Sequence, residues 1–222
     1  MGRKRRLSQE NNFSYLTGAL VLLLLGVAVA DEVGFRLGQT LIQSAIVVVL
    51  ALGIWTIQSQ RHWYMTRAGL VAAILVVMLA GLFFNWAHMD VLWLVILLAY
   101  LALTVWVATR QVLLTGPIDG NKIVGAVCIF LLLGLIWTTL YMLVAVRNPE
   151  AFYGIAPGPW HEIFPDLVYF SFVSMTTLGY GDIGPTAPIA RFLVYAEAIT
   201  GQFYIAVLVA TLVGIRISNH SE

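Results

Sequence analysis

Long apolar runs separated by short polar stretches dominate the pattern along the chain. A membrane-spanning helix needs about 20 apolar residues, with a tolerated range of roughly 17–25. Runs of about this length lie at Phe13–Ala30, Leu41–Ile57, Ala68–Trp86, Val91–Thr109, Ile123–Val146 and Phe192–Ile215. Because the runs are continuously apolar rather than alternating, they indicate helices. The pattern predicts an all-α membrane protein with six transmembrane helices.

Composition supports a membrane location. Hydrophobic residues make up 60% of the 222 residues and charged residues only 10%, against about 25% charged in an ordinary soluble domain. The formal net charge of +1 leaves no basic surface for nucleic acid. The single cysteine, Cys128, and four scattered histidines show no metal-binding spacing. We expect membrane lipid as a partner, with no nucleic acid.

The distribution of basic residues predicts the orientation. Lys and Arg near helix ends are enriched on the cytoplasmic side. With the N-terminus inside, nine basic residues fall on the cytoplasmic side: Arg3, Lys4, Arg5, Arg6, Arg61, Arg67, Arg110, Lys122 and Arg216. Three fall outside: Arg36, Arg147 and Arg191. Six spans then place both termini in the cytoplasm, and the protein in the cell membrane.

The N-terminus also resembles a secretory signal. Arg-rich Gly2–Arg6 precedes an apolar stretch that ends in Ala28-Val29-Ala30, which matches a cleavage site. Cleavage would leave five spans in the same orientation. We favour an uncleaved first helix, because the later spans make a signal anchor sufficient.

A short apolar segment between the last two long runs does not fit a spanning helix. Pro149, Gly154, Pro157 and Pro159 make 147–161 an irregular external stretch. Pro165 suits a first helical turn, and Pro165–Thr176 would form a helix of about 18 Å. The hydrocarbon core is about 30 Å thick, so this helix should enter the membrane without crossing it.

The next five residues, Thr177–Gly181, are here called the filter segment. Non-helical backbone at membrane depth is tolerated only where it is buried in protein or lines a water-filled path. Gly179 and Gly181 permit backbone angles closed to other residues, so successive carbonyls can face one side. Such a row of oxygens replaces the hydration shell of a monovalent cation. The Thr177 hydroxyl adds an oxygen at the inner end.

The sequence Thr176-Thr177-Leu178-Gly179-Tyr180-Gly181-Asp182 resembles the selectivity filter of the tetrameric potassium channel superfamily. The order of outer helix, external turret, pore helix, filter and inner helix also matches, over roughly 121–222. The resemblance implies K⁺ ions bound at Thr177, Leu178, Gly179 and Tyr180, with Gly181 completing the filter and Thr176, Asp182 and Tyr169 supporting it. It implies that Tyr169 is tied to Tyr180 and Asp182, and that Gly201 is a hinge in the inner helix.

Three residues depart from that family pattern. Leu178 stands where Val is most usual, so its side chain must pack differently behind the filter. The inner helix carries Glu197 and Gln202 where apolar residues are more usual. These departures point to altered conductance or gating rather than to lost potassium selectivity.

The resemblance divides the chain into a four-helix N-terminal transmembrane region, 1–118, and a pore domain, 119–222. A voltage sensor needs several basic residues within one span. Val91–Thr109 has no charged residue, and Arg110 lies at its end. We therefore expect no conventional voltage sensor, and a packing role for the first four helices around the pore.

Helical periodicity divides the inner helix into two faces. With 100° per residue, one stripe faces the cavity below the filter; it contains Gln202, Ile205, Ala206, Val209 and Val213. Glu197 lies about 140° from that stripe and points toward the pore helix or the outer helix. We hypothesise that Glu197 braces the pore helix and so influences gating. Its candidate partners are Ser174, Thr138, Thr139 and Tyr141.

The predicted function is passive, potassium-selective conduction by a homotetramer, in which four copies of Thr177–Gly181 surround the ion. The alternatives are a nonselective monovalent cation channel of the same architecture, or a silent subunit of a hetero-oligomeric channel. A transporter is disfavoured because the first half has no matching helix interruption, and no catalytic motif suggests an enzyme. Only seven residues follow Ile215, so no soluble ligand-binding domain is expected.

Overall fold

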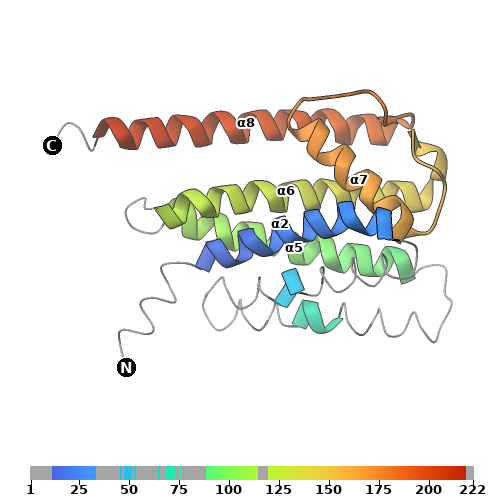
Figure 1. Ribbon diagram of the computed structural model, residues 1–222, viewed down its shortest axis with the longest axis horizontal. Coiled ribbons are helices and arrows are strands. Elements are labelled where there is room, and N and C mark those ends of the chain that lie inside the picture. The colour runs from blue at the N-terminus through green and yellow to red at the C-terminus, as the bar shows by residue number, and fades with distance from the viewer. Residues whose placement is uncertain are drawn as a thin grey trace.

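The computed structural model describes residues 12–33, 89–114 and 120–218, and scattered positions between 46 and 76 (Figure 1). Four long helices run along its longest dimension: α2 (Asn12–Val33), α5 (Met89–Leu114), α6 (Gly120–Arg147) and α8 (Pro188–Ser218). Each contains one predicted apolar run. The predicted runs Leu41–Ile57 and Ala68–Trp86 lie for the most part outside the described residues.

Two of the described helices are long and apolar enough to cross a membrane, over Val91–Val112 and Gly120–Arg147, and Phe13–Val29 forms a shorter apolar helix. At 1.5 Å per residue, the 28 residues of α6 extend about 42 Å, more than the thickness of the hydrocarbon core. Six spans thus remain a prediction, whereas a mostly helical chain with two long apolar helices is observed among the described residues.

Helix α6 is the centre of the bundle, because it contacts α2, α5, α7 and α8. Its fully buried Leu132 belongs to a continuous apolar core with Leu16 of α2, Leu94 of α5 and Leu167 of α7. At Gly125, an added Cβ would lie 2.8 Å from Val112 and 3.0 Å from the Phe13 ring, so the missing side chain lets three helices approach closely. The N-terminal helices therefore support the outer helix of the predicted pore domain directly.

The helix α7 (Trp160–Met175) crosses obliquely between α6 and α8 (Figure 1). It begins five residues before the predicted start, and the placement of Pro165 in the first turn is wrong, since Pro165 lies inside the helix. The earlier start arises because the Pro159 carbonyl accepts the amides of Glu162 (3.0 Å) and Ile163 (3.3 Å). Sixteen residues extend about 24 Å, so α7 is still too short to cross the hydrocarbon core.

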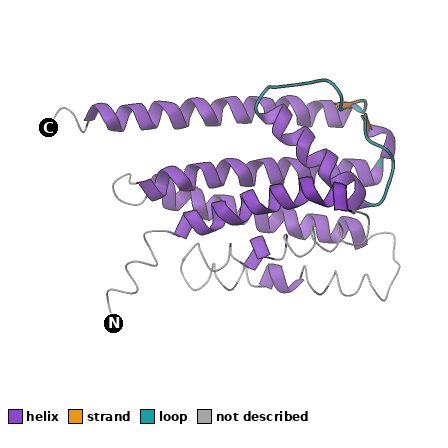
Figure 2. Ribbon diagram, viewed as in Figure 1, coloured by secondary structure: helices purple, strands orange, loops and turns teal. Residues whose placement is uncertain are grey.

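A small antiparallel sheet joins the two loops that flank α7 and the filter segment (Figure 2). After the short helix η1 (Pro149–Ala151), β1 (Phe152–Tyr153) pairs with β2 (Gly184–Pro185). The Thr186 amide extends the link by donating to the Ala151 carbonyl (2.9 Å). Residues on both sides of the filter segment are thereby held together at one end of the bundle.

Gly154 allows the loop before α7 to approach the backbone of Asp182, just after the filter segment. Its φ of +82° lies in the left-handed region, and an added Cβ would collide with the backbone carbonyl of Asp182. Gly154→Ala should therefore destabilise the fold by at least the roughly 1–2 kcal/mol that the left-handed backbone costs an L-residue. Thermal unfolding of the purified protein in detergent measures the effect.

Gly158→Ala is the matched control. Its Cβ would lie 2.6 Å from Glu162 Oε2, the end of a flexible side chain that can move aside. The melting temperature of this variant should stay near that of the wild type. Equal melting temperatures for the two variants would contradict the packing described for Gly154.

Candidate functional site

The filter segment follows α7 directly and has an alternating backbone. The φ angles of Thr177, Gly179 and Gly181 are +60°, +53° and +80°, whereas Leu178 and Tyr180 keep φ values outside the positive range. Alternation between positive and negative φ favours successive amides on one side of the chain and successive carbonyls on the other. Positive φ is uncommon for a β-branched residue such as Thr177, so the surrounding structure must hold it.

Hydrogen bonds at the end of α7 hold Thr177 in place. The Thr177 amide donates to the Ser174 carbonyl (3.0 Å), and the Leu178 amide donates to the Val173 carbonyl (2.9 Å). With Thr177 in the left-handed conformation, these two bonds form a Schellman motif, which usually places Gly at this position. The amides at the start of the filter segment are thus satisfied by the helix, and its carbonyls are left for other partners.

All five residues of the filter segment are exposed in the single subunit. Among the described residues, one hydrogen bond reaches a carbonyl of this segment, from the Tyr153 hydroxyl to Gly181 at 3.4 Å. An added Cβ at Gly179 or Gly181 would meet no atom within 4 Å. These glycines are required by backbone conformation rather than by crowding within the subunit.

The supporting residues lie on both sides of the filter segment. The Tyr169 hydroxyl donates to Asp182 Oδ2 at 2.7 Å, which joins two residues that the resemblance pairs. This hydrogen bond lowers the pKa of Asp182 below its ordinary value of 3.8. The Thr176 hydroxyl bonds back to the Phe172 carbonyl at 2.6 Å and so belongs to the end of α7. The Tyr180 side chain, predicted to join Tyr169, is 68% exposed.

The predicted cavity stripe begins at the inner end of the filter segment. Gln202 Nε2 lies 3.4 Å from Thr177 Oγ1, which places the side chain of Gln202 beside the first filter residue. Ile205 and Ala206 continue along the exposed surface of α8. Val209 and Val213 lie outside the residues whose side chains the structure describes. Ile205 and Ala206 are thus accessible in the single chain, and the cavity-lining role of the stripe stays a prediction.

Gly201 packs against the end of α7. An added Cβ at this position would collide with the Met175 backbone carbonyl, and Gly201 is buried. The resemblance suggested a hinge at Gly201, and the observed contact adds a packing reason for glycine here. Sequence reasoning did not identify Met175, because a methionine in an apolar helix carries no signal of such a contact.

Glu197 is fully buried between three helices, with 0% of its surface exposed. The Tyr141 hydroxyl of α6 donates to Oε2, and Ser171 Oγ of α7 lies 2.6 Å from Oε1. Glu197 therefore points toward both helices that the periodicity indicated.

Of the four candidate partners of Glu197, Tyr141 makes the contact. Ser174 is wrong as a partner on α7, because Ser171, one turn earlier, occupies that place. The hydroxyls of Thr138 and Thr139 bond instead to carbonyls of their own helix, at Gly134 (2.9 Å) and Leu135 (2.7 Å). The sequence could not choose between Ser171 and Ser174, because the tilt of α7 decides which of them faces α8.

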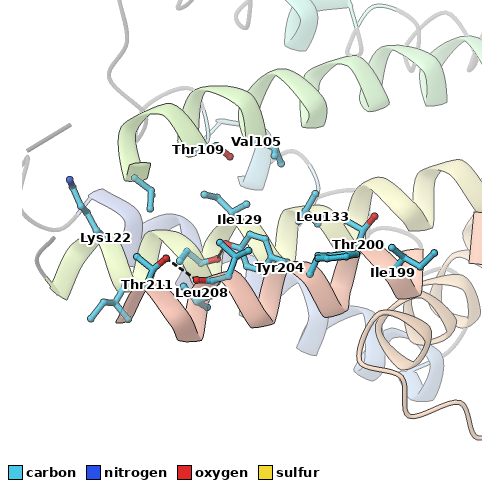
Figure 3. A pocket seen from close by; sticks show the side chains of 15 residues that line it. Val105, Thr109, Lys122, Ile129, Leu133, Ile199, Thr200, Tyr204, Leu208 and Thr211 are labelled. Atoms are coloured by element: carbon cyan, nitrogen blue, oxygen red, sulfur yellow. Dashed lines mark hydrogen bonds between the residues drawn. The ribbon is translucent and has the colours of Figure 1, made fainter. Parts of the chain in front are cut away.

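An apolar groove of about 560 Å³ lies away from the filter segment, between α5, α6 and α8 (Figure 3). Val105, Ile129, Leu133 and Ile199 are among its lining residues, and Lys122 lies at one end. Tyr204 also lines the groove and donates its hydroxyl to the Ala126 carbonyl at 2.6 Å. None of its lining residues belongs to the filter segment.

Comparison with known proteins finds similarity to ion channels over the segment that contains this site. Residues 129–216 match the family model described as "Ion channel". Two pore potassium channel c of Oryza sativa subsp. japonica is 30% identical over 81 residues, which cover 33% of this chain and 18% of that protein. No solved structure shows a significant match.

The matched segment contains α7, the filter segment and almost all of α8, the parts whose geometry is described above. The matched segment therefore resembles the pore domain of an ion channel. Over this segment the chain matches a family of ion channels rather than of enzymes, and it is distantly similar to a two-pore potassium channel.

The Tyr169–Asp182 hydrogen bond predicts a defined response to acid. A carboxyl group whose pKa is lowered by folding adds stability above its ordinary pKa and loses it as the pH falls through the lowered value. Tyr169→Phe removes the donor, so the pKa of Asp182 should rise toward 3.8. A titration of the Asp182 carboxyl carbon by NMR, from about pH 5 down to about pH 2, measures the shift.

Tyr153→Phe is the control for this titration. Its hydroxyl also lies at the filter exit but bonds to the Gly181 carbonyl rather than to Asp182. The pKa of Asp182 should stay unchanged in this variant. An unchanged Asp182 titration in Tyr169→Phe would show that the hydrogen bond does not stabilise the carboxylate.

Proposed function

We propose that the protein is a potassium-selective channel that conducts K⁺ passively through a pore formed by four identical chains. The observation that carries this proposal is the alternating backbone of Thr177–Gly181. Its first three amides bond to carbonyls of α7, and among the described residues only the Gly181 carbonyl has a hydrogen-bond donor. Rings of backbone carbonyls that replace the hydration shell are the known basis of potassium selectivity. The match to a pore-domain family and the distant potassium channel relative support the same conclusion.

Each filter residue has a proposed role. The carbonyls of Thr177, Leu178, Gly179 and Tyr180 bind K⁺ in successive rings, and Gly181 completes the outer end. Thr176, Tyr169 and Asp182 hold the two ends of the filter, through the hydrogen bonds to Phe172 and between Tyr169 and Asp182. Gln202 begins the lining of the cavity, which continues through Ile205, Ala206, Val209 and Val213.

The proposed pore domain, 119–222, is surrounded by the N-terminal helices of region 1–118, which pack rather than sense voltage. Within α5, Asp90 lies in the first turn and Arg110 near the C-terminal end, and the helix between them is uncharged. The Arg110 guanidinium lies over the Trp106 ring at 4.9 Å, an arrangement typical of a membrane interface. The proposed location is the cell membrane, with both termini in the cytoplasm.

A single chain contributes one filter segment, so a closed ring of carbonyls needs four copies. We therefore expect a homotetramer with a mass of about four times 24.5 kDa. Native mass spectrometry of the purified protein, with lipid removed stepwise, measures the assembly. A stable dimer that conducts ions by itself would contradict the fourfold filter.

The proposed filter predicts how one methyl group, added at Gly179, should affect the K⁺ current. Gly179 has a φ of +53°, which costs an L-residue roughly 1–2 kcal/mol in each of four subunits. Gly179→Ala should therefore abolish the K⁺ current of purified protein in a planar bilayer. Gly26→Ala is the control, because an added Cβ on this helical residue of α2 meets no atom within 4 Å.

Reversal potentials in mixed KCl and NaCl complete the test. The wild type should follow the K⁺ gradient, and Tyr180→Asp should admit Na⁺ by disordering one carbonyl ring. Equal permeation of Na⁺ and K⁺ by the wild type would identify a nonselective cation channel. Current that appears only with a second subunit type would identify a silent subunit. Normal conduction by a tetrameric Gly179→Ala variant would show that the filter is elsewhere.

A further inference from the structure

The carboxyl group of Glu197 lies in a buried cluster that the conduction path does not use. Its polar contacts among the described residues are the hydroxyls of Tyr141 and Ser171, both neutral. The Tyr141 ring is held by Phe152 at 5.5 Å and Phe170 at 5.2 Å between ring centroids, so its hydroxyl has a defined direction. A charged acid in this apolar setting would lack the paired cation that buried charges require.

Counting protons in the cluster gives a more specific result. Ser171 Oγ lies 2.6 Å from Glu197 Oε1 and 2.8 Å from the Gly134 carbonyl oxygen, both of them hydrogen-bond distances. A serine hydroxyl has one proton to donate, and a carbonyl has none. The two contacts are separate, unshared hydrogen bonds only if Glu197 is protonated. Oε1–H then donates to Ser171, Ser171 donates to Gly134, and Tyr141 donates to Oε2.

The cluster lies immediately before the filter segment. Glu197 and Gly201 are one turn apart on α8, and they contact Ser171 and Met175, which are one turn apart on α7. Met175 is the last residue of α7, and the filter begins two residues later at Thr177. Two successive turns of α8 therefore pack against the last two turns of α7.

We propose that Glu197 is a positioning residue of the filter: as a neutral carboxylic acid it links α8 to Ser171, and through Ser171 to the Gly134 carbonyl of α6. This link holds the last turns of α7 and with them the left-handed backbone of Thr177. An ionised Glu197 would instead accept the hydrogen bond of the Ser171 hydroxyl, so that Ser171 could no longer donate to the Gly134 carbonyl. The proposal rests on the proposed channel function, but its protonation part can be tested without current.

Infrared spectroscopy tests the protonation state. The difference spectrum between wild type and Glu197→Gln at neutral pH should contain the carbonyl stretch of one protonated carboxylic acid, and Ser171→Ala should shift that band. Subtraction removes the signals of all other acids. A difference spectrum that contains only carboxylate bands would overturn the proposal.

Single-channel recording tests the positioning role. Ser171→Ala breaks the chain of hydrogen bonds, and the loss of one buried hydrogen bond corresponds to about a tenfold fall in open probability. The ratio of K⁺ to Na⁺ permeability and the open-channel conductance should change far less. Glu197→Ala should reduce open probability at least as much, and Glu197→Gln should restore most of it, since the amide can donate to Ser171 and accept from Tyr141.

Thr139→Val is the matched control, because the Thr139 hydroxyl is equally buried but bonds only within α6, to the Leu135 carbonyl. Its open probability should equal that of the wild type. If the open probability of Ser171→Ala equals that of the wild type, the positioning role is wrong even though the channel is selective. If the wild type itself fails to select K⁺, the proposed function is wrong, and the infrared result still decides the state of Glu197.

Discussion

Backbone N–H and C=O groups inside a membrane must find hydrogen-bond partners within the protein. The proposed function requires the opposite for a few carbonyls of the filter segment, which must stay unpaired to bind the ion. The Schellman motif at the end of α7 satisfies the first amides of this segment without using the segment's own carbonyls. It uses the carbonyls of Val173 and Ser174 to satisfy the amides of Leu178 and Thr177, so the filter segment begins with its donors paired and its acceptors available. The alternating φ angles that follow keep those acceptors on one side.

The unusual conformation of Thr177 requires support from neighbouring elements. A β-branched residue at φ +60° is held only if the structure around it determines its position. On one side, Glu197 and Gly201 of α8 fix the last turns of α7. On the other side, the Tyr169–Asp182 hydrogen bond and the β1–β2 pair hold the exit of the filter segment. The segment is therefore fastened at both ends, with its middle residues exposed.

Helix α6 carries the connection from these local contacts to the rest of the molecule. It packs against α2 and α5 on one side and against α7 and α8 on the other, and it supplies Tyr141 and the Gly134 carbonyl to the buried cluster. Gly134 also lies against the Phe172 ring, where an added Cβ would approach to 2.6 Å. A shift of α6 would thus act on the end of α7 through two contacts, which gives the N-terminal helices a physical route to the pore.

The sequence by itself determined the helices and the filter segment, because both depend on local pattern. Apolar runs long enough to span a membrane predicted α2, α5, α6 and α8, and Gly179 and Gly181 indicated a backbone that only glycine adopts easily. The start of α7 was predicted five residues late, because a proline favours the first turn, whereas the carbonyl of Pro159 provided an earlier cap. Only the tertiary structure decided that Ser171 rather than Ser174 meets Glu197, and that Gly201 makes room for the Met175 carbonyl. Those contacts depend on the tilt of α7 between α6 and α8, which arises from packing among residues far apart in the chain.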